Sequence, residues 1–186
     1  MRKVPKLKFS LIILFSVLLI NCKSEKKAEN YISELNLVEN ISDFTTRMTE
    51  KDTVRIRVNL TMEHWVRIDE LILTKRKNKL NLQTTVKEDT TFMSKYEMRE
   101  NTLAELNFEN IDNEFEHHFL TNFRRTKIDS SENWIYRIIS QKDTLKFYTV
   151  GLGDKGGCVK EYFDFMHNYY PNEKEFIPIK VIEETE

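Results

Sequence analysis

The chain has 186 residues, and its 29 basic and 30 acidic side chains give a formal net charge of −1. This length suits one domain that buries a core of its own. A balance so close to neutral argues against a nucleic-acid-binding face, which would need a surplus of lysine and arginine.

The N-terminal segment has the pattern of an export signal. Four basic residues lie ahead of the apolar run from Phe9 to Ile20, which is shorter than the roughly 20 residues that a membrane-spanning helix needs. The run ends in Leu19-Ile20-Asn21-Cys22, which resembles the lipobox of bacterial lipoproteins. The resemblance implies that residues 1–21 are a signal peptide that is removed, and that Cys22 receives a diacylglyceryl group and an N-linked fatty acid such as palmitate.

Removal of residues 1–21 takes away four basic and no acidic side chains, so 25 basic residues remain against 30 acidic ones, a formal net charge of −5. Residues 22–30 are polar after the cysteine, and we expect them to form a tether. Ser24 stands where an acidic residue would be expected in a lipoprotein kept at the inner membrane, which favours the outer membrane, facing the periplasm. With Cys22 lipidated, only Cys158 remains, so no intramolecular disulfide is expected.

Residues 31–186 are expected to form a single domain that begins with a short helix and a loop. From Thr53 the period changes, because Val54, Ile56 and Val58 alternate with polar residues as in a strand with one wet face. Further strands are predicted around Leu71 and Leu73, over 80–86 and over 92–98, with a tight turn at Lys77-Asn78. Residues 53–98 are therefore predicted to be an antiparallel meander.

A helix is predicted from the steps of three and four residues that separate Phe108, Ile111, Phe115 and Phe119, with Asn107 or Asn110 as its cap. Two more strands are predicted over 134–139 and 145–150. The last helix has an apolar stripe and ends before Pro171; the stripe is made of Val159, Tyr162, Phe163, Met166 and Tyr170. A final extended segment is predicted over 176–181.

These elements predict an α+β fold. We expect an antiparallel sheet of about five to seven strands with two or three helices packed on one face.

All four glycines of the chain lie between the last predicted strand and the last helix. We interpret them as a strand–loop–helix joint that supplies positive-φ positions. The joint is also a candidate anion-binding turn made of Gly151, Gly153, Lys155, Gly156 and Gly157. Its G-x-G-x-x-G spacing is not taken as a dinucleotide site, because the chain after it is too short to complete a doubly wound sheet, and no cofactor is expected.

Cys158 is predicted at or near the first turn of the last helix, where the helix dipole favours a thiolate. A cysteine nucleophile also needs a histidine base, and no histidine follows this helix. His64, His117 or His118 would have to be supplied by the fold. A small cysteine packed under the helix is the favoured interpretation, so no catalytic residue is assigned.

Glu114 and His118 have the four-residue spacing of two metal ligands on a helix, but no third ligand is evident. We interpret them as the polar half of an amphipathic helix and expect no metal. Basic residues gather at 75–79 and at 124–127, where they suit a solvated turn or a contact with an anionic lipid or envelope polymer.

The expected function is that of a lipid-anchored cell-envelope protein that acts as a non-enzymatic binding or protective (immunity-type) module. Its partners would be the membrane, through the lipid on Cys22, and a protein or envelope polymer, but not nucleic acid. The alternatives are an envelope enzyme that uses Cys158 with a histidine supplied by the fold, and a carrier of a small ligand.

Overall fold

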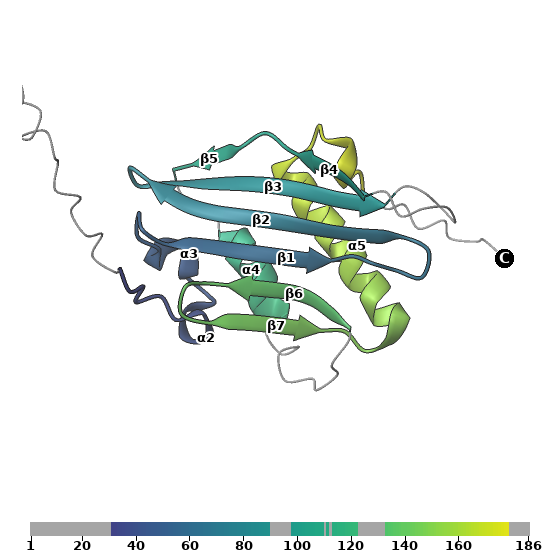
Figure 1. The fold of residues 1–186 in the computed structure, drawn as a ribbon, viewed down its shortest axis with the longest axis horizontal. Helices are drawn as coiled ribbons and strands as arrows, with labels where there is room; N and C mark the ends of the chain where they lie inside the picture. The colour runs from purple at the N-terminus through teal and green to yellow at the C-terminus, as the bar shows by residue number, and fades with distance from the viewer. Residues whose placement is uncertain (1–30, 90–97, 110, 112, 123–132, 179–186) are drawn as a thin grey trace, which may run out of the picture. The chain divides into compact units, whose positions relative to one another are not determined.

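Seven antiparallel strands form one sheet in the computed structural model, which describes residues 31–89, 98–109, 111, 113–122 and 133–178. Six strands follow the order β4-β3-β2-β1-β6-β7, and β5 pairs with β3 beside β4 (Figure 1). The strands are β1 (Thr53–Asn59), β2 (Val66–Arg76), β3 (Lys79–Asp89), β4 (Met98–Thr102), β5 (Leu106–Phe108), β6 (Trp134–Ile139) and β7 (Thr144–Tyr148). The described residues from Ile32 onward belong to one compact unit.

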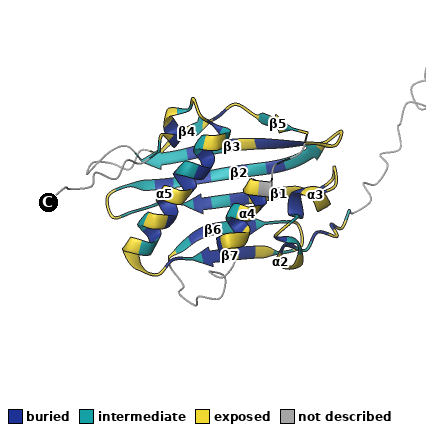
Figure 2. Cartoon of the chain, turned by 180° about the vertical axis from the view of Figure 1, so that it is seen from behind, coloured by how far each residue is buried: buried dark blue, intermediate teal, exposed yellow. Residues whose placement is uncertain are grey.

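Helices cover one face of this sheet. Helices α4 (Asn113–Asn122) and α5 (Gly151–Tyr169) both lie behind the strands in Figure 1 and in front of them in Figure 2. The short helices α2 (Leu37–Asn40), α3 (Phe44–Arg47) and η2 (Lys174–Phe176) complete the described elements. The α+β class and the antiparallel sheet of five to seven strands are thereby confirmed. Of the described helices, none is both long and apolar enough to cross a membrane.

The core lies between the sheet and α4 and α5. The alternation in β1 buries Val54, Ile56 and Val58 completely, as predicted, because every second side chain of a strand points to the same face. The apolar stripe of α5 is buried against this face, again as predicted. On α4, Phe115 and Phe119 are fully buried, with ring centroids 5.5 Å apart.

The hairpin between β2 and β3 turns at Lys77-Asn78, as predicted. Both residues have positive φ, 51° and 62°, which matches the two-residue turns that follow the twist of a hairpin. The expected meander is therefore confirmed for β1, β2 and β3. The strand predicted over 92–98 lies outside the described residues except for Met98, where β4 begins.

Local predictions before α4 and near the end of the chain were wrong. Phe108 ends the short strand β5 and does not belong to the helix, since Leu106, Asn107 and Phe108 pair with β3. Asn107 is for the same reason no helix cap, and Asn110, the other predicted cap, lies outside the described residues. Phe176 ends the one-turn helix η2, because its side chain packs between Tyr162 and Tyr170. Ile177, in the same predicted segment, has an extended backbone, and residues 179–181 lie outside the described residues.

A buried ion pair joins the sheet to the C-terminal part of the chain. The guanidinium of Arg67 on β2 donates two hydrogen bonds to Asp69, of 2.8 and 2.9 Å, and a third, of 3.0 Å, to the backbone carbonyl of Glu175. The hydroxyl of Tyr162 on α5 donates to Asp69 at 3.1 Å. Burial raises the pKa of Tyr162 well above its usual value, so this hydroxyl stays a donor. The cluster connects β2, α5 and η2.

Candidate anion-binding face of the sheet

The face of the sheet away from α4 and α5 carries a group of basic side chains. In β1 the buried valines and isoleucine alternate with Arg55 and Arg57, which therefore point to the opposite face. Figure 1 views the sheet from this side, and no described helix crosses in front of the strands. We call this surface the open face.

Strand register places three cations next to one another on the open face. Arg57 of β1 is directly opposite Arg137 of β6, and Arg137 is directly opposite Lys146 of β7. Residues directly opposite in a sheet point to the same side. We call Arg57, Arg137 and Lys146 the basic row. On its other side Arg57 is opposite Glu70 of β2.

Although Glu70 lies directly opposite Arg57, none of the three cations of the basic row forms an ion pair with a described residue. The carboxylate of Glu70 forms an ion pair of 3.3 Å with Arg55. The Nε atoms of Arg57 and Arg137 are shielded from solvent and have no hydrogen-bond partner. Like charges directly opposite each other destabilise a sheet, and a shielded donor without a partner adds a further cost. An added anion would offset the repulsion within this row.

Trp134 lies beside the basic row because β6 is irregular. In a regular strand Trp134 would share a face with Tyr136 and Ile138, but the register of β6 against β7 shifts between Trp134 and Tyr136. This shift reverses the alternation. The Trp134 ring consequently packs against Arg137, whose guanidinium carbon is 5.0 Å from the ring centroid. Such a contact holds the guanidinium in place without neutralising it.

A second row of side chains on the open face is partly apolar. Arg55 is directly opposite Ile72 on one side and Ile139 on the other, and Ile139 is opposite Thr144. Both isoleucines are half-buried, and Arg55 and Thr144 are exposed. The open face therefore presents guanidinium groups, which bind carboxylates or phosphates through paired hydrogen bonds, beside apolar surface.

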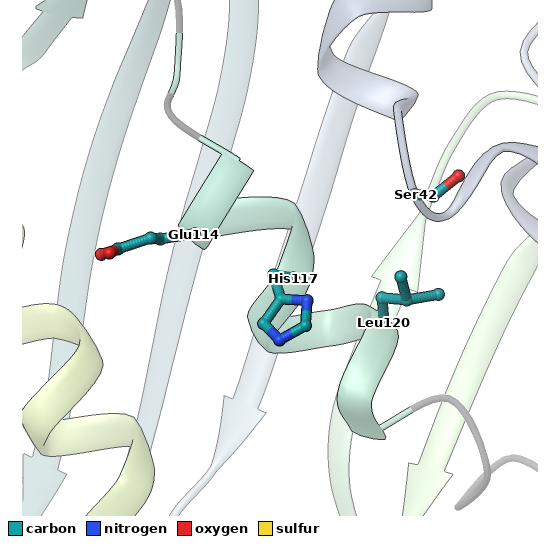
Figure 3. A pocket seen from close by; sticks show the side chains of 4 residues that line it. All are labelled: Ser42, Glu114, His117 and Leu120. Atoms are coloured by element: carbon teal, nitrogen blue, oxygen red, sulfur yellow. The ribbon is translucent and has the colours of Figure 1, made fainter.

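The helix face carries two hollows next to α4. A groove of about 710 Å³ between α4 and α5 is lined by Glu114, His117, His118, Thr121, Asn122, Glu161, Asp164, Phe165 and Asn168. A smaller hollow of about 300 Å³ is lined by Ser42, Glu114, His117 and Leu120. Figure 3 shows that Ser42 and Glu114 point in opposite directions, with His117 between them. These three side chains therefore do not form a nucleophile–base arrangement.

His118 is held by core contacts. Its ring stacks on Phe165 with centroids 4.1 Å apart, and its Nε2 is 2.8 Å from the hydroxyl of Tyr136. Burial, and to a lesser extent the charge of His117, lowers the pKa of His118 to about 4. Glu116, its neighbour, is buried and accepts hydrogen bonds from the backbone N–H and the hydroxyl of Thr45. Among the described residues, no three His, Cys, Asp or Glu side chains are placed to hold a metal ion.

The prediction that Cys158 lies at or near the first turn of the last helix is wrong. Helix α5 begins at Gly151, which makes Cys158 its eighth residue and places it about two turns inside. The side chain is 2% exposed. The expected help from the helix dipole is therefore absent, since this effect falls off after the first turn.

The predicted glycine loop is instead the first part of α5. Only Gly151 has a positive φ, 73°, and Gly153, Gly156 and Gly157 lie within the helix. The carboxylate of Asp154 accepts a hydrogen bond of 2.7 Å from the N–H of Val150 at this helix end. Lys155 is buried, and desolvation lowers its pKa. Anion binding at this turn stays a prediction.

The basic residues at 75–79 are at the tip of the β2–β3 hairpin, as expected. The ammonium group of Lys75 donates to the carbonyls of Thr46 and Met48, and Lys79 pairs with Glu109 at 3.4 Å. The second basic group, at 124–127, lies outside the described residues, as does Cys22. Comparisons with models of protein families, with curated proteins and with solved structures found no match for this chain.

The basic row was not predicted from the sequence. The alternation around Arg55 and Arg57 predicts a strand with one solvent-exposed face, and Arg137 lies in a predicted strand. Nothing local indicated that β1 and β6 are neighbours, or that the register would place these arginines opposite each other. The Arg137 and Trp134 contact depends in addition on an irregularity that alternation alone does not reveal.

Proposed function

We propose that this protein is a lipid-anchored module of the bacterial cell envelope that binds a macromolecular partner through the open face of its sheet. Anchoring is supported by the lipobox-like sequence that ends at Cys22. Binding is supported by one observation above all, the basic row, whose two guanidinium groups form no ion pair with the described residues and have shielded Nε atoms without a hydrogen-bond partner. Protection of the cell by capture of a harmful protein, as in immunity lipoproteins, is one form that such binding takes.

The anchor is tested by measuring the mass of the mature N-terminus. We expect a chain that begins at Cys22 and carries the added mass of a diacylglyceryl group and a fatty acid. Cys22→Ala should abolish the modification and release the protein from the membrane fraction. An intact Met1, or an unmodified Cys22, would contradict the proposal. Separation of inner and outer membranes tests the expected location facing the periplasm.

The binding face is tested by photo-crosslinking in intact cells. A photoreactive residue replaces Thr144, which is exposed on the open face, or Lys160, which is exposed on α5. We expect a specific adduct from position 144 and none from position 160. Adducts at position 160 alone would assign binding to the helix side. The absence of an adduct at position 144 would contradict the proposed function.

A further inference from the structure

We propose that the occupant of the open face is an acidic segment of a protein partner, in which carboxylate side chains alternate with apolar ones. This inference rests on the proposed function and specifies the chemistry of the partner. It follows from the charge of the basic row, the spacing of its members and the apolar residues beside it.

The charge of the row calls for an anion. Arg57 and Arg137 are half-buried and directly opposite each other, and the Nε atom of each is shielded without a hydrogen-bond partner. The nearest acidic residue in register, Glu70, is paired with Arg55. A partly desolvated cation gains more from an added carboxylate than a fully exposed one, because the local dielectric constant is lower.

The spacing of the row suits carboxylates presented by a polypeptide. Neighbouring strands are about 4.8 Å apart, so Arg57, Arg137 and Lys146 span roughly 10 Å across β1, β6 and β7. In an extended segment, side chains two residues apart are separated by about 7 Å and point the same way. Two such carboxylates crossing the strands would each contact one or two cations of the row.

The apolar neighbours favour a protein over other polyanions. Ile72 and Ile139 flank Arg55 in the adjacent row and keep part of their surface exposed. A protein segment carries apolar side chains that can cover these isoleucines. A polyphosphate, an acidic polysaccharide or a lipid headgroup has the charge but lacks such side chains. Removing the isoleucine surface from water would stabilise the complex.

The experiment follows the fluorescence of Trp134, which packs against Arg137. The chain has two tryptophans, so Trp65→Phe in the full-length protein leaves Trp134 as the single reporter. The probe is a short synthetic peptide in which glutamate alternates with leucine and threonine. Control probes are the same peptide with glutamine for glutamate, a polyglutamate of equal length, inorganic polyphosphate, and vesicles of phosphatidylglycerol and phosphatidylcholine.

We expect the acidic apolar peptide to change Trp134 emission and to saturate. Arg57→Gln should weaken binding by about tenfold, the loss of one charge-assisted contact, whereas Lys160→Gln, with the same charge change on α5, should leave it unaltered. Calorimetric titration of the protein with both tryptophans provides the same comparison if Trp65→Phe disturbs folding.

Binding of polyphosphate, polyglutamate or vesicles as tight as that of the acidic apolar peptide would overturn the inference, as would binding that Arg57→Gln does not weaken. The crosslinking at position 144 separates this failure from failure of the proposed function. An adduct whose partner segment lacks acidic residues would refute the inference while the binding function stands. An adduct with an acidic, apolar segment would support both.

Discussion

His118 makes stability depend on pH at the scale of a single residue. Its pKa is lowered by burial from 6.5 to about 4 in the folded protein. At pH values between these two, the His118 side chain therefore binds a proton in the unfolded chain but not in the folded protein. The contribution of His118 to stability is therefore full above the unfolded pKa and is lost as the pH falls from 6.5 towards 4.

Because of His118, we expect the free energy of unfolding to fall by about 2 kcal/mol when the pH is lowered from neutral to about 5. His118→Gln should retain a hydrogen bond to Tyr136 but remove this part of the pH dependence. Urea unfolding at both pH values measures the difference. Glu114, Glu161 and Asp164 line the same groove in both proteins, so the comparison cancels their contribution. His64→Gln, at an exposed histidine, is the matched control, and equal slopes in all three proteins would contradict the prediction.

Gly151 and Gly153 should respond oppositely to alanine. Gly151 has φ of 73°, which an alanine adopts only with strain, so Gly151→Ala should destabilise the protein by about 1 kcal/mol or more. Gly153 lies in the helix, and an added Cβ would meet nothing within 4 Å. Gly153→Ala should therefore stabilise by about 0.5–1 kcal/mol. Thermal unfolding of the two variants decides, and a shift in the same direction for both would refute the expected contrast.

At the scale of elements, the buried pair of Arg67 and Asp69 holds α5 and η2 to β2. Asp69→Asn leaves the Arg67 charge buried without its partner, so we expect a loss of about 3–5 kcal/mol. Replacing both members, as in Arg67→Met with Asp69→Leu, should recover much of this loss because no buried charge remains.

Urea unfolding with a double-mutant cycle measures this coupling. The pair of Lys160 and Asp164 on the surface of α5 is the control, and its loss should cost less than about 0.5 kcal/mol. A double variant at Arg67 and Asp69 that is no more stable than Asp69→Asn would contradict the expectation.

Elements with a strong period were predictable from the sequence, and short ones were not. The alternation in β1 and the stripe of α5 each reflect one buried face, and both predictions hold. Phe108 kept the helical spacing of its neighbours but pairs with Leu80, because a three-residue strand is fixed by its partner and not by its own period. The glycines predict a loop because they supply positive-φ positions, but only Gly151 has a positive φ. The packing of the α5 stripe overrides the low helix propensity of the other three.

At the scale of the whole molecule, the candidate site exists only because distant segments meet. Arg57 and Arg137 could each be placed on a strand face from the sequence. Their pairing required the strand order, in which β6 adds to the free edge of β1 beyond the meander. No local pattern specifies this order, which results from packing of the whole sheet against α4 and α5.

The basic row should lower the stability of the isolated protein while it favours binding of the partner. Because Arg57 faces Arg137 while the opposite Glu70 is paired with Arg55, Arg57→Gln should stabilise the isolated protein by a few tenths to about 1 kcal/mol. The same substitution is expected to weaken binding. Urea unfolding in low salt tests this, with Lys160→Gln as the control of equal charge change. A clear destabilisation by Arg57→Gln would show that the row is not under repulsion.

The pairing of β1 with β6 joins residues that are far apart in the chain, since positions 57 and 137 are separated by 80 residues. The β1–β2–β3 meander, by contrast, closes through short connections. Loop closure over a long separation costs more entropy and slows folding. The meander should therefore form first, and the contact of Trp134 with Arg137 should appear only when β6 docks. In refolding kinetics, the emission of Trp134 would then mark the final step, at which the binding face itself is completed.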